Sequence, residues 1–215
     1  MNPPIPTPIF RMLHIDNLPV VLQRGGMHAS NQIPADGLPY KTIHNLDIQN
    51  ERHQRIIPCG SGGTLHDYVP FYLGPRSPML LQLHTGRVTG YTEGQTPLIY
   101  LVSTAQKVAE AGCGFVFSDG HGIARFTEWY ADLVNLDKLD WDMIYARIWR
   151  DSVDDMDKQR RKQAEFLMYH HCPWGLIQEI AVINSGMTAK VTEILSAYPH
   201  LQQPAIKIRS EWYYG

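Results

Sequence analysis

The feature that most constrains the fold is an alternation of short apolar segments with signals that begin or end helices. Segments rich in β-branched and aromatic residues, which are typical of strands, are Ile9–His14, Val69–Leu73, Leu98–Val102 and Phe115–Ser118. Two further strands are predicted, Glu165–Cys172, with Glu165 at its entrance, and Ala205–Tyr213. Because strands and helices follow one another in this way, the sequence predicts a mixed α/β fold.

Helix signals lie between these segments. Asp16 or Asn17 can cap a short helix that ends at Gly25. Ser77, which is followed by proline, starts a second helix, and Ser103 has the capping-box spacing that starts a third. The order of charges and the apolar spacing predict further helices at Asp154–Gln163, Trp174–Ile183 and Thr188–Ala197.

Two stretches have weaker patterns. Met27–Thr64 is rich in Gly, Asn, Pro and His, so we expect a long loop region with short strands, and such loops are usually functional. Arg125–Arg150 is aromatic and charged, with only partial helical spacing. Nothing in the composition marks a boundary between two cores, and the sequence therefore predicts one domain over residues 1–215.

The balance of charge limits the mode of nucleic-acid binding. The chain of 215 residues has a formal net charge of −2, so no overall positive field would hold a duplex by its phosphates. Any nucleic-acid contact must therefore be local. Basic and aromatic residues do gather in one region, where Trp149, Arg150, Arg160 and Arg161 are candidate contacts to single-stranded nucleic acid. A solvated helix whose basic residues compensate its dipole explains this region equally well.

The cysteine and histidine patterns argue against a metal site. The three cysteines are far apart and form no CxxC pair, which fits a reducing cytoplasm. His170 and His171 are adjacent on a predicted strand, where they would point to opposite faces and could not simply share one ion. We also expect no export and no membrane insertion, because the N-terminus lacks a signal pattern and Leu98–Val102 is far too short to span a bilayer.

Three polar residues are candidates for catalysis, but each also has a simpler explanation. His14 could be a hydrogen-bonded core histidine, Arg52 a surface residue and Glu165 an exposed strand end. The glycines of Gly60–Gly63 match neither the P-loop nor the dinucleotide-binding pattern. Spacing alone therefore leaves the catalytic role of these residues open.

Four longer segments, residues 7–18, 47–80, 117–130 and 163–174, together resemble the DarT family, the toxin half of DarT–DarG toxin–antitoxin pairs. They contain the motifs LHIDNL, NERHQR, SDGHG and QAEFL. The resemblance covers most of the chain. It implies an ADP-ribosyltransferase fold of the α+β class, with a central split sheet of mixed and antiparallel strands flanked by helices. It also implies that NAD is the co-substrate and that the acceptor is a base of single-stranded DNA, thymine N3 above all.

The same resemblance implies roles for individual residues. Glu165 in QAEFL matches the catalytic glutamate and Arg52 in NERHQR the catalytic arginine, although Arg55 lies in the same motif. His14 and His121 match histidines of the NAD site. Asp16 and Asn17, next to His14, are expected to help bind NAD, as is Arg52.

The expected mechanism rests on one carboxylate. Glu165 would bond a ribose hydroxyl and accept the thymine N3 proton, and its removal is expected to stop transfer without affecting folding. N3 lies on the Watson–Crick edge, so the DNA must be single-stranded or the base flipped out. The resemblance also implies a DarG-type macrodomain antitoxin as partner. Two alternatives remain open, namely an ADP-ribosyltransferase acting on RNA, guanine or protein, and a nonenzymatic nucleic-acid-binding module.

Overall fold

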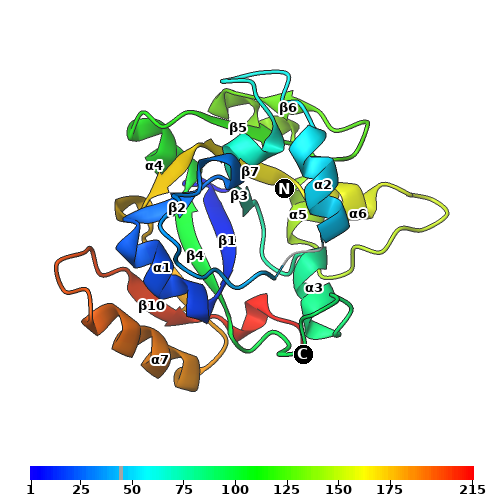
Figure 1. The fold of residues 1–215 in the computed structure, drawn as a ribbon. Helices are drawn as coiled ribbons and strands as arrows, with labels where there is room; N and C mark the ends of the chain where they lie inside the picture. Colours follow the sequence, from blue (N-terminus) through cyan, green and yellow to red (C-terminus); the bar gives the residue numbers. More distant parts are fainter. Residues whose placement is uncertain (44–45) are drawn as a thin grey trace.

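The fold, taken from a computed structural model, describes residues 1–43 and 46–215. Within these residues, eight strands form one sheet in the order β10-β9-β4-β1-β3-β7-β5-β6 (Figure 1). The strands are β1 Pro8–His14, β3 Tyr68–Tyr72, β4 Leu98–Thr104, β5 Phe115–Ser118, β6 Trp129–Tyr130, β7 Glu165–Tyr169, β9 Glu179–Val182 and β10 Ala205–Ile208. β9 and β10 are parallel, and the other pairs are antiparallel. This arrangement confirms the expected mixed sheet. A second sheet pairs β2 Gly26–His28 with β8 His171–Pro173.

The large sheet is almost divided in its centre. β1 pairs with β4 along seven positions but with β3 at one position only, where Phe10 faces Tyr72. Beyond this pair the two strands diverge. Because diverging strands cannot bond to each other, side chains must line the gap between β1 and β3.

Helices cover both faces of the sheet. The α-helices are α1 Leu18–Gln23, α2 Leu46–Gln54, α3 Pro78–His84, α4 Ala105–Glu110, α5 Trp141–Tyr145, α6 Lys158–Lys162 and α7 Ser185–Ser196. The 3₁₀ turns are η1 Ile15–Asn17, η2 Ser30–Gln32, η3 Leu65–Asp67, η4 Leu133–Lys138, η5 Trp174–Leu176 and η6 Ser210–Trp212. Figure 1 shows α7 beside β10, at one edge of the sheet. Of the helices described here, none combines the length and the apolar character needed to cross a membrane.

The hydrophobic core lies on both faces of the central strands, as their alternating side chains require. Ile9 and Leu13 of β1 pack with residues of α1, α4 and α7 on one face. Phe10 and Met12 pack on the other face, with residues of α3 and with Tyr213. The central strands are therefore held from both sides, which gives the site a rigid base.

Several sequence predictions are confirmed, with small changes at the helix ends. Ser77 caps α3 and accepts a hydrogen bond from the Leu80 N–H. The third helix is capped one residue later than expected, because Thr104 accepts from the Lys107 N–H. The helix predicted from Thr188 starts at Ser185 as α7.

Other predictions are wrong for identifiable reasons. The expected loop Met27–Thr64 contains α2, which has no apolar face to reveal it; His44 and Asn45, also within this loop, lie outside the described residues. Trp174–Ile183 is not a helix but a 3₁₀ turn followed by β9, since pairing with β4 and β10 overrides the helical spacing. Asp154–Gln163 is helical only in α6, and Ala205–Tyr213 is extended only to Ile208.

The strand predicted for Glu165–Cys172 is interrupted. His170 has a φ of 58°, in the left-handed region, so the chain turns there and continues into β8 of the second sheet. The premise that His170 and His171 alternate along one strand is therefore wrong. Among the residues that the structure describes, no cluster of three or more His, Cys, Asp or Glu side chains could hold a metal ion.

Candidate active site

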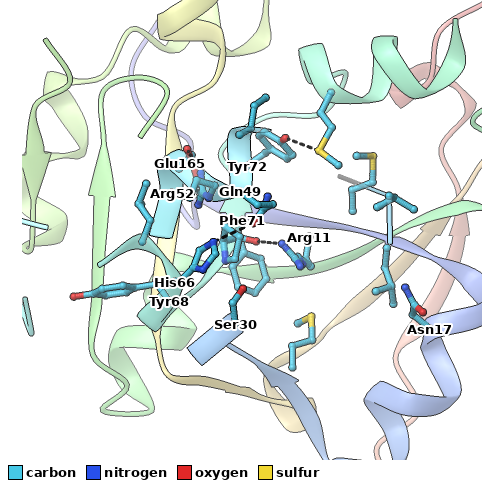
Figure 2. A pocket seen from close by; sticks show the side chains of 18 of the residues that line it. Arg11, Asn17, Ser30, Gln49, Arg52, His66, Tyr68, Phe71, Tyr72 and Glu165 are labelled. Carbon is cyan, nitrogen blue, oxygen red and sulfur yellow. Dashed lines mark hydrogen bonds and ion pairs between the residues drawn. The ribbon is translucent and has the colours of Figure 1, made fainter. Parts of the chain in front are cut away.

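A cavity of about 500 Å³ opens where β1 and β3 diverge (Figure 2). Its walls come from β1, α1, β2, α2, β3 and α3. The polar residues that line it include Arg11, Asn17, Arg52, His121 and Glu165. The cavity therefore brings together residues that are far apart in the sequence, from Arg11 to Glu165.

Glu165 begins β7, and its carboxylate is buried. It lies opposite Tyr72 in the sheet, and its backbone N–H donates to Ser118 Oγ at 3.2 Å. The residue is 4% exposed, so the strand end is not the exposed position that the simpler explanation assumed. A buried carboxylate is costly unless charges and hydrogen bonds compensate it.

Arg52 of α2 supplies that compensation. Its Nη1 donates to Glu165 Oε1 at 3.0 Å, while Nη2 lies 2.9 Å from Oε2. This second contact is an ion pair without hydrogen-bond geometry, and Nη2 has no acceptor among the described residues. Both side chains are less than a tenth exposed. The pair thus fixes the carboxylate and leaves a donor for a ligand.

The pair also keeps the carboxylate charged. Burial by itself raises the pKa of Glu165, but the charge and hydrogen bond of Arg52 outweigh it, so the pKa is lowered from its ordinary value. Burial likewise opposes the charge of Arg52, yet the neighbouring carboxylate raises the pKa of the guanidinium. Glu165 is therefore an anion at neutral pH and can act as an acceptor.

The loop after β5 completes the surroundings of Glu165. The Gly122 N–H donates to Glu165 Oε1 at 2.9 Å. A Cβ at this glycine would lie 3.0 Å from the same oxygen, so any other residue here would press on the carboxylate. Because Oε1 accepts from both Arg52 and Gly122, Oε2 is the oxygen with free acceptor capacity.

His121 lies in the same loop and lines the cavity. Its backbone is held on two sides, since its N–H donates to the Arg160 carbonyl at 3.0 Å and its carbonyl accepts from Thr127 Oγ1 at 2.7 Å. Burial lowers the pKa of His121, and the nearby charge of Glu165 opposes this shift only in part. The imidazole is therefore neutral at pH 7 and can both donate and accept.

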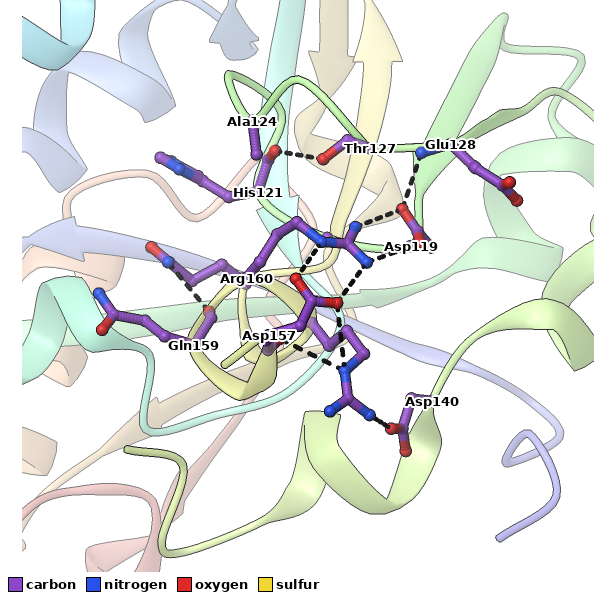
Figure 3. Close-up of polar contacts among 12 residues, drawn as sticks. Asp119, His121, Ala124, Thr127, Glu128, Asp140, Asp157, Gln159 and Arg160 are labelled. Carbon is purple, nitrogen blue, oxygen red and sulfur yellow. Dashed lines mark hydrogen bonds and ion pairs between the residues drawn. The ribbon is translucent and has the colours of Figure 1, made fainter. Parts of the chain in front are cut away.

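Acidic residues neutralise the two arginines expected to bind nucleic acid (Figure 3). Arg160 bonds both oxygens of Asp119, at 2.8 and 3.0 Å, and both oxygens of Asp157, at 2.7 and 2.8 Å. Arg161 pairs with carboxylates of Asp140 and Asp155. Aspartates of the protein itself thus compensate both positive charges, and contact of these arginines with DNA stays a prediction.

Trp149 and Arg150, the other two expected nucleic-acid contacts, lie apart from the cavity. The Trp149 indole donates to the Tyr214 hydroxyl at 3.2 Å, and Arg150 is exposed. Neither is among the described residues that line the cavity, and the same holds for Arg160 and Arg161. A role of these four residues in DNA binding would require a surface outside the cavity.

His14 is buried at the end of β1 and is not among the lining residues of the cavity. Its Nδ1 accepts from the Asp16 backbone N–H at 3.1 Å, and its Nε2 lies 3.3 Å from Glu93 Oε2. In the neutral ring the hydrogen is therefore on Nε2 and faces Glu93. The Asp16 side chain is largely exposed and pairs with Lys41 at 3.2 Å.

Asn17, by contrast, lines the cavity but caps no helix. Its Oδ1 accepts from the Lys41 N–H at 2.6 Å, and its Nδ2 donates to the Lys41 carbonyl at 2.8 Å. The expected capping bond to α1 is absent, because both ends of the amide are used in this way. Asn17 therefore pins the loop that precedes α2.

Sequence reasoning missed Arg11 and Tyr72. Both line the cavity, and burial raises the pKa of Tyr72 to about 12, so its hydroxyl is neutral. Arg11 lies in the middle of β1, between residues that pack into the core. A charge inside an otherwise apolar strand was the available signal.

Comparison with known proteins finds relatives that match almost the whole chain. Residues 10–214 match the family model "ssDNA thymidine ADP-ribosyltransferase, DarT". A DNA ADP-ribosyl transferase of Thermus sp. (strain 2.9) is 44% identical over 211 residues, which is 98% of each chain.

Solved structures of that Thermus protein share the fold. Thermus sp. 2.9 DarT in complex with ADP-ribosylated ssDNA superposes with a TM-score of 0.93 at 42% identity, covering 100% of this chain and 99% of that one. The same protein in complex with NAD⁺ gives a TM-score of 0.89 at 41% identity, covering 99% and 100%. The α+β ADP-ribosyltransferase fold expected from the resemblance is thereby confirmed, and the chain belongs to the DarT family of ssDNA thymidine ADP-ribosyltransferases.

Proposed function

We propose that residues 1–215 act as one domain that cleaves NAD and transfers its ADP-ribose to thymine N3 of single-stranded DNA. The observation that carries this proposal is the ionised carboxylate of Glu165, held by Arg52 inside a cavity that His121 also lines. Thermus DarT, which is similar along its whole length, has been solved with NAD⁺ and with ADP-ribosylated ssDNA. The same two substrates are proposed here.

Glu165 is the proposed catalytic carboxylate. When the bond between the nicotinamide nitrogen and the ribose breaks, positive charge develops on the sugar, and a nearby anion stabilises it. Nicotinamide leaves as a neutral molecule with the bonding electrons. Thymine N3 then forms the new bond to the sugar carbon, and its proton goes to Glu165. Oε2 is the oxygen proposed for this step, since Oε1 already accepts two hydrogen bonds.

Arg52, rather than Arg55, is the proposed partner of this carboxylate. Arg52 contacts Glu165 directly, whereas the Arg55 guanidinium donates to the Ala124 carbonyl at 3.0 Å and does not line the cavity. Arg52 would keep Glu165 ionised and correctly oriented. His14, Asp16 and Asn17 are proposed to shape the neighbouring part of the NAD site, directly or through the loop that Asn17 holds.

The acceptor is proposed to be unpaired DNA for a chemical reason. Thymine N3 carries its proton on the edge that base pairing hides, so the base must be exposed before it can reach Glu165. The family model names the same class of acceptor. We further propose that the protein works in the cytoplasm, with a DarG-type macrodomain antitoxin as its partner, because the family to which it belongs is the toxin half of such pairs.

Mass spectrometry of treated oligonucleotides tests the proposal. A single-stranded, thymine-containing oligonucleotide incubated with NAD and the protein should gain one ADP-ribose on thymine, and its fully paired duplex should gain none. Glu165→Gln should give no product. Glu179→Gln is the matched control, because Glu179 is also ion-paired, to Arg209 and Lys207, but lies in β9. Modification of RNA or protein instead of DNA would contradict the acceptor, and absence of NAD cleavage would contradict the whole proposal.

A further inference from the structure

The cavity contains an arginine, Arg11, that no carboxylate of the described residues neutralises. Five lysine and arginine side chains line it, and three of them are paired with carboxylates, namely Arg24 with Asp36, Lys41 with Asp16 and Glu93, and Arg52 with Glu165. Within the described residues, Arg11 and Arg87 have no carboxylate within 4 Å. Arg87 is exposed to solvent, but Arg11 is half-buried.

Arg11 is held in place by one hydrogen bond, but not all of its N–H groups have an acceptor among the described residues. Its Nη1 donates to the Pro70 carbonyl at 3.0 Å, across the gap where β1 and β3 diverge (Figure 2). Its Nε is buried and has no acceptor in the part of the chain that the structure describes. The bond to Pro70 fixes the direction of the guanidinium, while the remaining N–H groups are left for another partner.

A half-buried guanidinium without a counter-ion favours an anion as its ligand. Removing the charge from water is unfavourable, and a bound anion would recover that loss. The flat, forked arrangement of N–H groups matches the oxygens of phosphate better than an ammonium does. The cavity wall therefore has the chemistry of a phosphate site at Arg11.

We propose that Arg11 binds the diphosphate of NAD, an inference that rests on the proposed function of the cavity. NAD carries its two phosphates between two riboses, so a molecule whose nicotinamide ribose lies at Glu165 places its phosphates farther along the same cavity. In Figure 2, Arg11 and the Arg52–Glu165 pair occupy separate places on the cavity wall. Arg52 does not serve this purpose, because its charge is already used by Glu165.

The test compares binding of ADP-ribose with binding of adenosine, which has no phosphate, by calorimetry. Arg11→Gln should weaken ADP-ribose binding by about 10- to 100-fold, as expected for lost hydrogen bonds to a charged group, and should leave adenosine binding unchanged. The KM for NAD should rise by a similar factor while kcat changes little.

Arg55→Gln is the matched control. Like Arg11, Arg55 donates from its guanidinium to a backbone carbonyl at 3.0 Å and has a buried Nε without an acceptor among the described residues, but it does not line the cavity. This variant should bind ADP-ribose as the wild type does. If Arg11→Gln fails to fold, Arg11→Lys replaces it and should still bind ADP-ribose more weakly than the wild type, with adenosine binding unchanged.

Several results would overturn the inference. ADP-ribose binding that is unchanged in Arg11→Gln contradicts it, and so does an equal loss for ADP-ribose and adenosine, which would indicate a structural role. A loss confined to DNA binding would assign Arg11 to a DNA phosphate instead. The proposed function fails separately, if wild-type protein binds ADP-ribose through Arg11 but modifies no DNA. Wild-type protein that binds no ADP-ribose would refute both.

Discussion

Replacing Glu165 by glutamine is expected to destabilise the fold as well as to stop catalysis. The sequence alone suggested that the removal of Glu165 would leave folding intact. In the structure, however, the carboxylate is the counter-ion of a buried guanidinium, and Arg52 would remain in the interior with an uncompensated charge. Breaking one side of a buried pair typically costs about 3–5 kcal/mol.

The size of the effect follows from the position of the pair. The side chains are 8% and 5% exposed, but they line a cavity that water can enter, so we take the lower end, about 3 kcal/mol. For a domain of this size that lowers Tm by roughly 6–12 °C. Replacing both partners at once, as in Arg52→Met with Glu165→Leu, should recover most of this loss, because no buried charge is left.

The loss should also depend on pH. The pKa of Glu165 is lowered in the folded protein from its ordinary value of 4.5. The pair therefore stabilises the fold at pH values above 4.5, and this contribution disappears as the pH falls through the folded pKa. The difference in Tm between the wild type and Glu165→Gln should be full at pH 7 and should shrink below about pH 4.5.

Thermal unfolding followed by circular dichroism between pH 3 and pH 7 measures the Tm of each variant and its dependence on pH. Glu193→Gln, at an exposed position of α7, serves as the control and should leave Tm unchanged. Equal Tm values for the wild type and Glu165→Gln at pH 7 would refute the reasoning. A difference that stays constant down to pH 3 would show that charge is not its cause.

Three further predictions concern the residues around the carboxylate. Arg160→Met should reduce kcat for oligonucleotide modification about tenfold with little change in the KM for DNA. The reason is that the two hydrogen bonds from Arg160 to Asp119, which fix the loop after β5, are lost. Gly122→Ala should reduce kcat by about 10- to 100-fold, since its Cβ would lie 3.0 Å from Oε1 of Glu165 and would displace the carboxylate; single-turnover kinetics would measure this step. Asn17→Ala should raise the KM for NAD about tenfold by releasing Lys41, as initial rates at varied NAD would show.

Local patterns in the sequence are sufficient to predict most of the strands and helices that surround the site. β1, β3, β4 and β5 have β-branched and aromatic runs, and α3 has a capping serine followed by proline. In contrast, α2 has only two apolar residues, Leu46 and Ile48, and no apolar face, so its pattern does not distinguish it from a loop although it carries Arg52. β9 was mistaken for a helix because short apolar runs fit both periods and only its neighbours in the sheet decide between them.

The electrostatic relations of the site could not be predicted from spacing. Arg52 and Glu165 are 113 positions apart, and no local rule connects them without a known family. The basic run around Arg160 and Arg161 resembles a surface for DNA because two of the acids that neutralise it, Asp119 and Asp140, are distant in the sequence. Charge runs indicate a binding surface only after their internal partners are known.

The pairing of charges also suggests different roles for Arg11 and Arg52, two of the arginines that line the cavity. An arginine paired with a buried carboxylate attracts a phosphate less strongly than an unpaired arginine does, because the carboxylate already compensates its charge. Arg52 is paired with Glu165 and so suits the reacting sugar, whereas Arg11 has no acid beside it among the described residues and so suits the diphosphate. The divergence of β1 and β3 makes this division possible, since it opens the sheet between them and gives each guanidinium its own place on the wall of one cavity.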